Sequence, residues 1–151
     1  MIFKYNFFFR WPEDCSKLAN QFFEIGGFPS TAGVIDGCHI NISPPKNDKL
    51  SFLNRHHSTS INVLAVAGPD LSFYFVDASA PGRSHDSKVL KESALWTAME
   101  AGERPFPGGV LLGDSGFALR DWLVTPFPGW DQLCSNKKMY LKLKVDHMNQ
   151  A

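Results

Sequence analysis

The 151-residue sequence has few cysteines, and their spacing excludes two classes of small protein. Cys15, Cys38 and Cys134 are an odd number, and no Cys-x-x-Cys pair occurs among them. We therefore expect neither a disulfide framework nor a thiolate zinc site, and a reducing compartment inside the cell fits this cysteine usage best.

The sequence also lacks a long hydrophobic run and an excess of charge. No apolar stretch approaches the roughly 20 residues of a membrane-spanning helix. The aromatic start of the chain is interrupted by Lys4, Asn6 and Arg10, which argues against a signal peptide. With 15 basic and 15 acidic residues the formal net charge is 0, which neither indicates nor excludes nucleic-acid binding. We expect one domain without a membrane partner.

What is present predicts a mixed α/β domain. Apolar periodicity predicts helices over residues 13–25 and 86–101 and a short helix over 117–124. Short, largely apolar runs predict strands over 32–42, 60–67, 71–78 and 110–112, with 60–67 and 71–78 joined as an antiparallel hairpin. Because three strands precede the long helix, the order differs from a doubly wound βαβ repeat.

Two aspartates at the ends of apolar runs are the main candidates for chemistry. Asp36 interrupts the run from Val34 to Ile40, and Asp114 follows the run that begins at Val110. A carboxylate beside a buried strand is costly unless it is hydrogen-bonded, paired or bound to a cation. Mg²⁺ takes carboxylate oxygens together with substrate phosphates, so the two aspartates suggest a metal-dependent site for phosphodiester chemistry.

Each aspartate also has a plainer structural interpretation. Asp36 followed by Gly37 is a good signal for a hairpin turn. Asp114 suits a helix N-cap or a turn in which Gly116 adopts a positive φ. Local sequence leaves both alternatives open.

The remaining candidates lie in predicted loops. His85 is a candidate metal ligand or acid/base group, whereas Asp86 or Ser84 is expected to cap the helix over 86–101. Arg55 begins a segment with two histidines that suits either phosphate contact or an ordinary solvated loop. The basic run from Lys137 to Lys144 is either a solvated face or a weak nucleic-acid candidate.

Several segments, taken in order, resemble one known family. They are Arg10-Trp11-Pro12, Gly26-Gly27-Phe28-Pro29, Gly33-Val34-Ile35-Asp36-Gly37-Cys38-His39-Ile40, Phe52-Leu53-Asn54-Arg55, Ser60-Ile61-Asn62-Val63, Pro81-Gly82-Arg83-Ser84-His85-Asp86-Ser87-Lys88-Val89-Leu90, Leu111-Leu112-Gly113-Asp114-Ser115-Gly116-Phe117-Ala118-Leu119 and Trp122-Leu123-Val124-Thr125-Pro126-Phe127. The ordered set resembles the catalytic domain of PIF/Harbinger-type transposases and the Harbinger transposase-derived nucleases. The resemblance divides the chain into an unmatched segment 1–9, a partial DDE-type nuclease domain 10–127 and a divergent basic tail 128–151.

The resemblance implies an RNase H-like fold, incomplete at the C-terminus, with a triad of two aspartates and one glutamate that holds Mg²⁺ or Mn²⁺ and cuts DNA. By position, Asp36 matches the first aspartate and Asp114 the second. The third member should be a glutamate on a later helix, but no glutamate follows Glu103. Asp146 is the only acidic residue near a suitable spacing, and its surroundings do not match the family helix.

The functional expectation is therefore a metal-dependent endonuclease or transposase-derived domain whose activity is impaired by the missing carboxylate and by truncation. Arg55 and His85 are the expected substrate contacts. The family also implies DNA as substrate, a Myb-like DNA-binding partner and a location in the nucleus, with the cytoplasm as a further site. The alternative is a non-catalytic domesticated fragment that binds DNA or protein.

Overall fold

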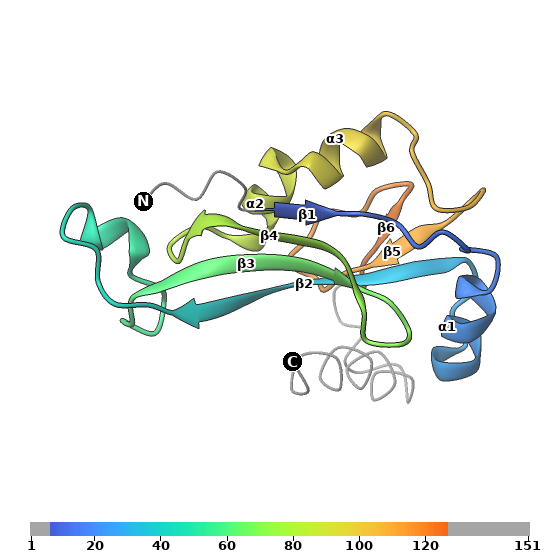
Figure 1. Ribbon diagram of the computed structural model, residues 1–151, viewed down its shortest axis with the longest axis horizontal. Coiled ribbons are helices and arrows are strands. Elements are labelled where there is room, and N and C mark those ends of the chain that lie inside the picture. Colours follow the sequence, from blue (N-terminus) through green and yellow to red (C-terminus); the bar gives the residue numbers. More distant parts are fainter. Residues whose placement is uncertain (1–6, 127–151) are drawn as a thin grey trace.

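A six-stranded mixed sheet organises the computed structural model, which describes residues 7–126 (Figure 1). In chain order the elements are β1 (Phe7–Phe9), α1 (Leu18–Gly26), β2 (Thr31–Asn41), the 3-10 helix η1 (Lys49–Phe52), β3 (Ser60–Ala67), β4 (Phe73–Pro81), α2 (Asp86–Glu92), α3 (Ala94–Glu100), β5 (Val110–Leu112) and β6 (Leu123–Val124). Among residues 7–126, no helix is long and apolar enough to span a membrane.

The strand order is β1-β4-β3-β2-β5-β6. Strands β2, β3 and β4 form an antiparallel meander, and β1 adds to its outer edge in antiparallel pairing. On the other side β5 pairs parallel with β2, and β6 pairs parallel with β5. The predicted hairpin and the mixed α/β class are confirmed, and the order is consistent with the RNase H-like fold that the resemblance implied.

The two faces of the sheet carry different helices because side chains alternate along a strand. Ile35, Leu64 and Val66 face the side where Leu90 and Leu95 of α2 and α3 complete the main core. On the opposite face, Val34 and Leu112 pack with Phe22 of α1 in a smaller cluster. Figure 1 shows α2 and α3 above the sheet and α1 below one end of it.

Helix α1 begins later than the periodicity predicted. The Asp14 carboxylate accepts hydrogen bonds from the backbone N–H and hydroxyl of Ser16, and such local bonding offers the backbone an alternative to the helix. The helix begins at Leu18, and Gly27 caps its end with a φ of 70°, as the glycine pair predicted.

The predicted helix over 86–101 is interrupted at Ser93. This residue is extended, with φ −86° and ψ 158°, and its side chain accepts from the backbone N–H of Trp96 at 3.2 Å. Its hydroxyl also donates to the carbonyl of Leu90 at 2.7 Å. Serine is a preferred N-cap residue, so one helix ends and the next begins at this position.

The predicted helix over 117–124 is wrong, and β1 was not predicted. Leu123 and Val124 form β6, because pairing with β5 satisfies backbone groups that a helix here would have used internally. Trp122 is almost fully buried and lies edge-on to Trp96, with ring centroids 5.5 Å apart. The aromatic start of the chain forms the edge strand β1, where Phe9 packs edge-on against Phe75.

Trp122 anchors the β6 edge and provides a test of this arrangement. We expect Trp122→Ala to lower the free energy of unfolding by about 3–5 kcal/mol, the usual cost of truncating a buried aromatic residue. Urea denaturation followed by circular dichroism measures the change. Leu119→Ala, at a side chain that is 61% exposed, is the control and should shift stability by no more than about 0.5 kcal/mol. Equal effects of the two changes would contradict the buried position of Trp122.

Candidate functional site

Asp36 lies inside a continuous strand. It pairs with Ala65 of β3, and the register between β2 and β3 runs without a break from Val34 to Asn41. The hairpin-turn interpretation of Asp36 and Gly37 is therefore wrong. Asp36 is half-buried and belongs to the same face of β2 as Val34, the face covered by α1 rather than by α2.

Asp114 is brought to the corresponding position on the neighbouring strand. Val34 of β2 pairs with Leu112 of β5 in parallel register, and Asp36 and Asp114 each lie two residues beyond this pair. Asp114 is also half-buried. The two aspartates that the sequence singled out therefore lie at matched positions just beyond the parallel-paired stretch of β2 and β5, on the side of the sheet where open α/β sheets place ligand-binding groups.

The loop after β5 holds the Asp114 carboxylate in a turn. Its Oδ1 accepts a hydrogen bond from the backbone N–H of Gly116 at 2.9 Å, so the turn interpretation is correct. The predicted positive φ at Gly116 is wrong, because the glycines with positive φ in the described part of the chain are Gly27, Gly102 and Gly108. This hydrogen bond fixes the orientation of the Asp114 carboxylate.

Beyond the two aspartates, one edge of β2 is left open by the described residues. Strand β5 ends at Leu112, opposite Val34, whereas β2 continues to Asn41. Within residues 7–126, no strand pairs with that side of β2 after Val34. Among the described residues, the site therefore lies at the point where β2 extends past its parallel neighbour.

A third carboxylate approaches the same stretch of β2 from the other face. The predicted capping role of Asp86 is wrong: His85 is the N-cap of α2, and Asp86 is the first residue of the helix. The Asp86 carboxylate instead accepts from Nδ2 of Asn62 at 2.6 Å. It packs against Gly37 so closely that a Cβ at that position would overlap it.

Asn62 and Asp86 are the residues whose roles the sequence reasoning missed. Asn62 is almost fully buried, and its Nδ2 also donates to the carbonyl of Ser84 at 2.8 Å. Its Oδ1 is buried and finds no hydrogen-bond partner among residues 7–126. The available signal was an asparagine within the apolar run of β3, because a buried amide requires partners.

The negative charges of Asp36 and Asp86 both act on Cys38. Burial raises the pKa of the Cys38 thiol, and the negative charges of Asp36 and then Asp86 raise it further. Both carboxylates therefore act on one short segment of β2 from its two sides. Among residues 7–126, however, no three His, Cys, Asp or Glu side chains form a group that could hold a metal ion.

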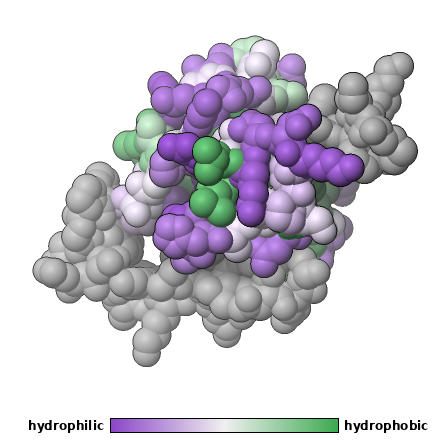
Figure 2. Space-filling view, turned by 90° about the vertical axis from the view of Figure 1, so that its left-hand side faces the viewer, coloured by the Kyte–Doolittle hydropathy of each residue, from purple (hydrophilic) through white to green (hydrophobic). Residues whose placement is uncertain are grey.

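The two predicted substrate contacts, Arg55 and His85, line one cavity of about 150 Å³ next to Asp86. The cavity lies at the end of the molecule formed by the last residues of β2, the loop after η1 and the loop before α2. His56 and His57, which follow Arg55 in the sequence, do not line it. Figure 2 shows that this end of the molecule is mostly hydrophilic around a small hydrophobic patch.

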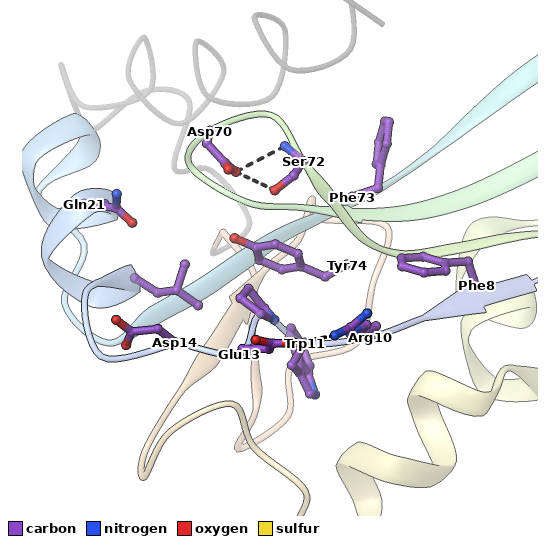
Figure 3. Close-up of a pocket in the computed structure, with 12 residues that line it drawn as sticks. Phe8, Arg10, Trp11, Glu13, Asp14, Gln21, Asp70, Ser72, Phe73 and Tyr74 are labelled. Atoms are coloured by element: carbon purple, nitrogen blue, oxygen red, sulfur yellow. Dashed lines mark hydrogen bonds and ion pairs between the residues drawn. The ribbon is translucent and has the colours of Figure 1, made fainter.

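A larger cavity of about 480 Å³ lies at the opposite end of β4 and contains none of the predicted site residues. Tyr74 and Phe73 line it from β4, and Trp11 lines it from the segment after β1 (Figure 3). Its charged side chains have local partners: Arg10 pairs with Glu13 at 2.6 Å, and Asp70 accepts from Ser72. It is separate from the aspartate site.

Asp146 and the basic run from Lys137 to Lys144 lie outside the described residues. Their predicted roles, as a weak third ligand and as a nucleic-acid contact, stay predictions.

Comparison with known proteins identifies relatives over most of the chain. The family model for a DDE superfamily endonuclease matches residues 35–148. The human protein named "Putative nuclease HARBI1" is 37% identical over 122 residues, which cover 79% of this chain and 34% of the relative. The Arabidopsis thaliana "Protein ALP1-like" is 33% identical over 132 residues, which cover 79% of this chain and 32% of the relative.

The chain thus spans about a third of the length of the curated relatives it matches. No solved structure matches it significantly. The family match extends over more than half of the chain and includes Asp36, Asp86 and Asp114. On this match, the chain belongs to the DDE superfamily endonucleases.

Proposed function

We propose that the chain forms the aspartate-bearing part of a divalent-metal-dependent endonuclease that acts on DNA phosphodiesters. The observation that carries this proposal is the matched register of Asp36 and Asp114 on the parallel strands β2 and β5. Family membership supports nuclease chemistry. The cation, the DNA substrate and the roles of individual residues are our inference.

The residues present at the site fit a hard divalent cation. Two half-buried carboxylates just beyond the parallel-paired stretch of β2 and β5 supply oxygen ligands of the kind that Mg²⁺ and Mn²⁺ prefer. Asp36 and Asp114 would be the residues that hold the cation. When bound, such cations activate the attacking oxygen and stabilise the leaving oxygen of the phosphodiester.

The chain's own residues prepare this site in three ways. The backbone N–H of Gly116 fixes the orientation of the Asp114 carboxylate. The strand pairing of Asp36 with Ala65 holds its backbone rigidly in the sheet. Asp86 packs against Gly37 and accepts a hydrogen bond from Asn62. Its negative charge next to Asp36 on β2 favours cation binding at this edge of the sheet.

Activity in this chain alone is expected to be weak. Since residues 104–151 contain no glutamate, these 151 residues supply no counterpart of the third ligand that the resemblance implies, and Asp146 is a poor substitute. A site that lacks one ligand should retain part of its metal affinity while losing most of its catalysis. The Myb-like partner and the nuclear location rest on the family resemblance alone and stay predictions.

Titration with Mn²⁺ tests the two-aspartate site directly. We expect weak binding to the wild-type chain by calorimetry, and its loss in Asp36→Asn and Asp114→Asn, because each change removes a charged ligand. Asp121→Asn is the matched control, since Asp121 is an exposed carboxylate that pairs with Arg104 at 3.4 Å. Any nicking of supercoiled plasmid in Mn²⁺ should fall by about two to three orders of magnitude in Asp36→Asn, the equivalent of several kcal/mol.

The same experiment separates the alternative function. A wild-type chain that binds no Mn²⁺ but does bind DNA or protein would favour the non-catalytic binding module. Robust plasmid nicking that survives Asp36→Asn would contradict the proposed site.

The contribution of the Asp86 charge to metal binding can be tested with a variant that removes the charge but keeps the hydrogen bond. Asp86→Asn keeps an oxygen that accepts from Asn62 but removes the negative charge. We expect it to weaken Mn²⁺ binding by about tenfold, as is typical of groups next to a metal site, with no change in the melting temperature. Asp86→Ala should also destabilise the fold by about 1–3 kcal/mol, because the buried Asn62 amide loses an acceptor. If Asp86→Asn leaves the Mn²⁺ affinity unchanged, the charge of Asp86 has no effect on metal binding, and its role is confined to the hydrogen bond with Asn62.

A further inference from the structure

The small cavity beside Asp86 is formed by three segments that are far apart in the sequence. His39 comes from the end of β2, Arg55 from the loop after η1, and Arg83 and His85 from the loop before α2. The remaining lining residues are Gly37, Gly82, Ser84 and Asp86. Sequence reasoning singled out Arg55 and His85, but Arg83 and His39 join them only in the folded chain.

The charges around the cavity favour an anion. Arg55 and Arg83 are positively charged at any physiological pH, and both are exposed at the rim. The exposed imidazoles of His39 and His85 add hydrogen-bonding nitrogens. The one acidic lining residue, Asp86, already accepts a hydrogen bond from Asn62 and packs on Gly37.

The loop that carries Arg83 is fixed against its neighbours. The backbone N–H of Gly82 donates to the carbonyl of Ser60 at 2.8 Å, and that of Arg83 donates to the carbonyl of Ser51 at 3.1 Å. A Cβ at Gly82 would overlap Ser60. This close approach, which requires glycine, ties the loop before α2 to β3 and η1.

The loop that carries Arg55 is fixed by Asn54. The buried Asn54 side chain accepts from the backbone N–H groups of His56 and Ser58, and its Nδ2 donates to Ser60 Oγ at 2.9 Å. Ser60 Oγ lies 3.1 Å from Nδ1 of His39. One network of side chains therefore links the Arg55 loop to His39, so that the cavity is built before any ligand arrives.

We propose that this cavity is a subsite for a backbone phosphate of the nucleic-acid strand, with Arg55 and Arg83 as the charged contacts and His39 as a hydrogen-bonding contact. The inference rests on the proposed nuclease function, which it deepens by assigning where the strand lies. Planar guanidinium groups match phosphate geometry, and exposed arginines at a rim can reach a macromolecule.

The position of the subsite relative to the aspartates supports a nucleic-acid strand over a small anion. His39 lies three residues after Asp36 on β2, a separation of about 10 Å along an extended strand. Asp36 and His39 lie on opposite faces of β2, and no strand among residues 7–126 pairs with this edge of β2 after Val34, so a bound strand would pass around that edge. A polymer with repeated phosphates can therefore place one phosphate in the cavity while another lies at Asp36 and Asp114.

DNA binding by the full 151-residue chain in EDTA tests the subsite without metal chemistry. Fluorescence anisotropy with a short labelled duplex, measured over a range of KCl concentrations, gives both affinity and salt dependence. We expect Arg83→Ala and Arg55→Ala each to weaken binding several-fold and to reduce the slope of log K against log salt by about 0.9, the value for one lost phosphate contact. Arg83→Lys should retain most of the slope.

Lys17→Ala is the matched control, because Lys17 is an exposed cation at the start of α1, away from the cavity. If the arginine variants resemble Lys17→Ala while their thermal melts match the wild type, the subsite is refuted. Inorganic phosphate is the second probe. Arg83-dependent binding of phosphate without Arg83-dependent binding of DNA would refute the nucleic-acid assignment.

Failure of the proposed function has a different signature. In that case the wild-type chain would bind no Mn²⁺, and Asp36→Asn would leave all readouts unchanged, whereas the arginine dependence of DNA binding in EDTA would remain.

Discussion

The parallel pairing of β5 with β2 is the constraint on which the candidate site depends. Backbone hydrogen bonds between these two strands set one register, Val34 opposite Leu112, and that register alone carries Asp36 and Asp114 to equivalent positions. Buried neighbours on both faces hold it: Ile35 and Leu111 in the main core, Val34 and Leu112 in the smaller one. A slip by one residue would move these apolar side chains to the wrong faces.

The second feature that shapes the site is the close packing of two segments against glycines, where any larger side chain would overlap its neighbour. Gly37 lets the Asp86 carboxylate touch the backbone of β2, and Gly82 lets the loop before α2 touch Ser60. Together they draw α2 and its preceding loop onto the part of β2 that extends beyond β5. The result places carboxylates at one part of this edge and arginines a few residues farther along. Opposite charges in this order suit a polyanion held beside bound cations.

Particular residues explain how far the sequence could predict the fold. The apolar runs of β3 and β5 and the glycine after α1 were sufficient to predict these elements, because residue pattern and turn chemistry act over short distances. Ser93 and the segment before β6 were misjudged, since apolar spacing alone does not distinguish a continuous helix from two capped ones or from an edge strand. Asp86 was misjudged for the same reason: as a local signal it is a cap, but tertiary contact gives it Asn62 as its partner.

The sequence by itself determined the candidate aspartates, the mixed α/β class and, through an ordered series of motifs, the family. These depend on residue identity and local order, which a linear chain carries in full. Only the tertiary structure decided that Asp36 and Asp114 share a register, that Asp86 reaches β2 from the opposite face, and that Arg83 and His39 join Arg55 and His85 around one cavity. Those relations are set by long-range strand pairing and close backbone contact between segments that are distant in the chain, and no local pattern encodes them.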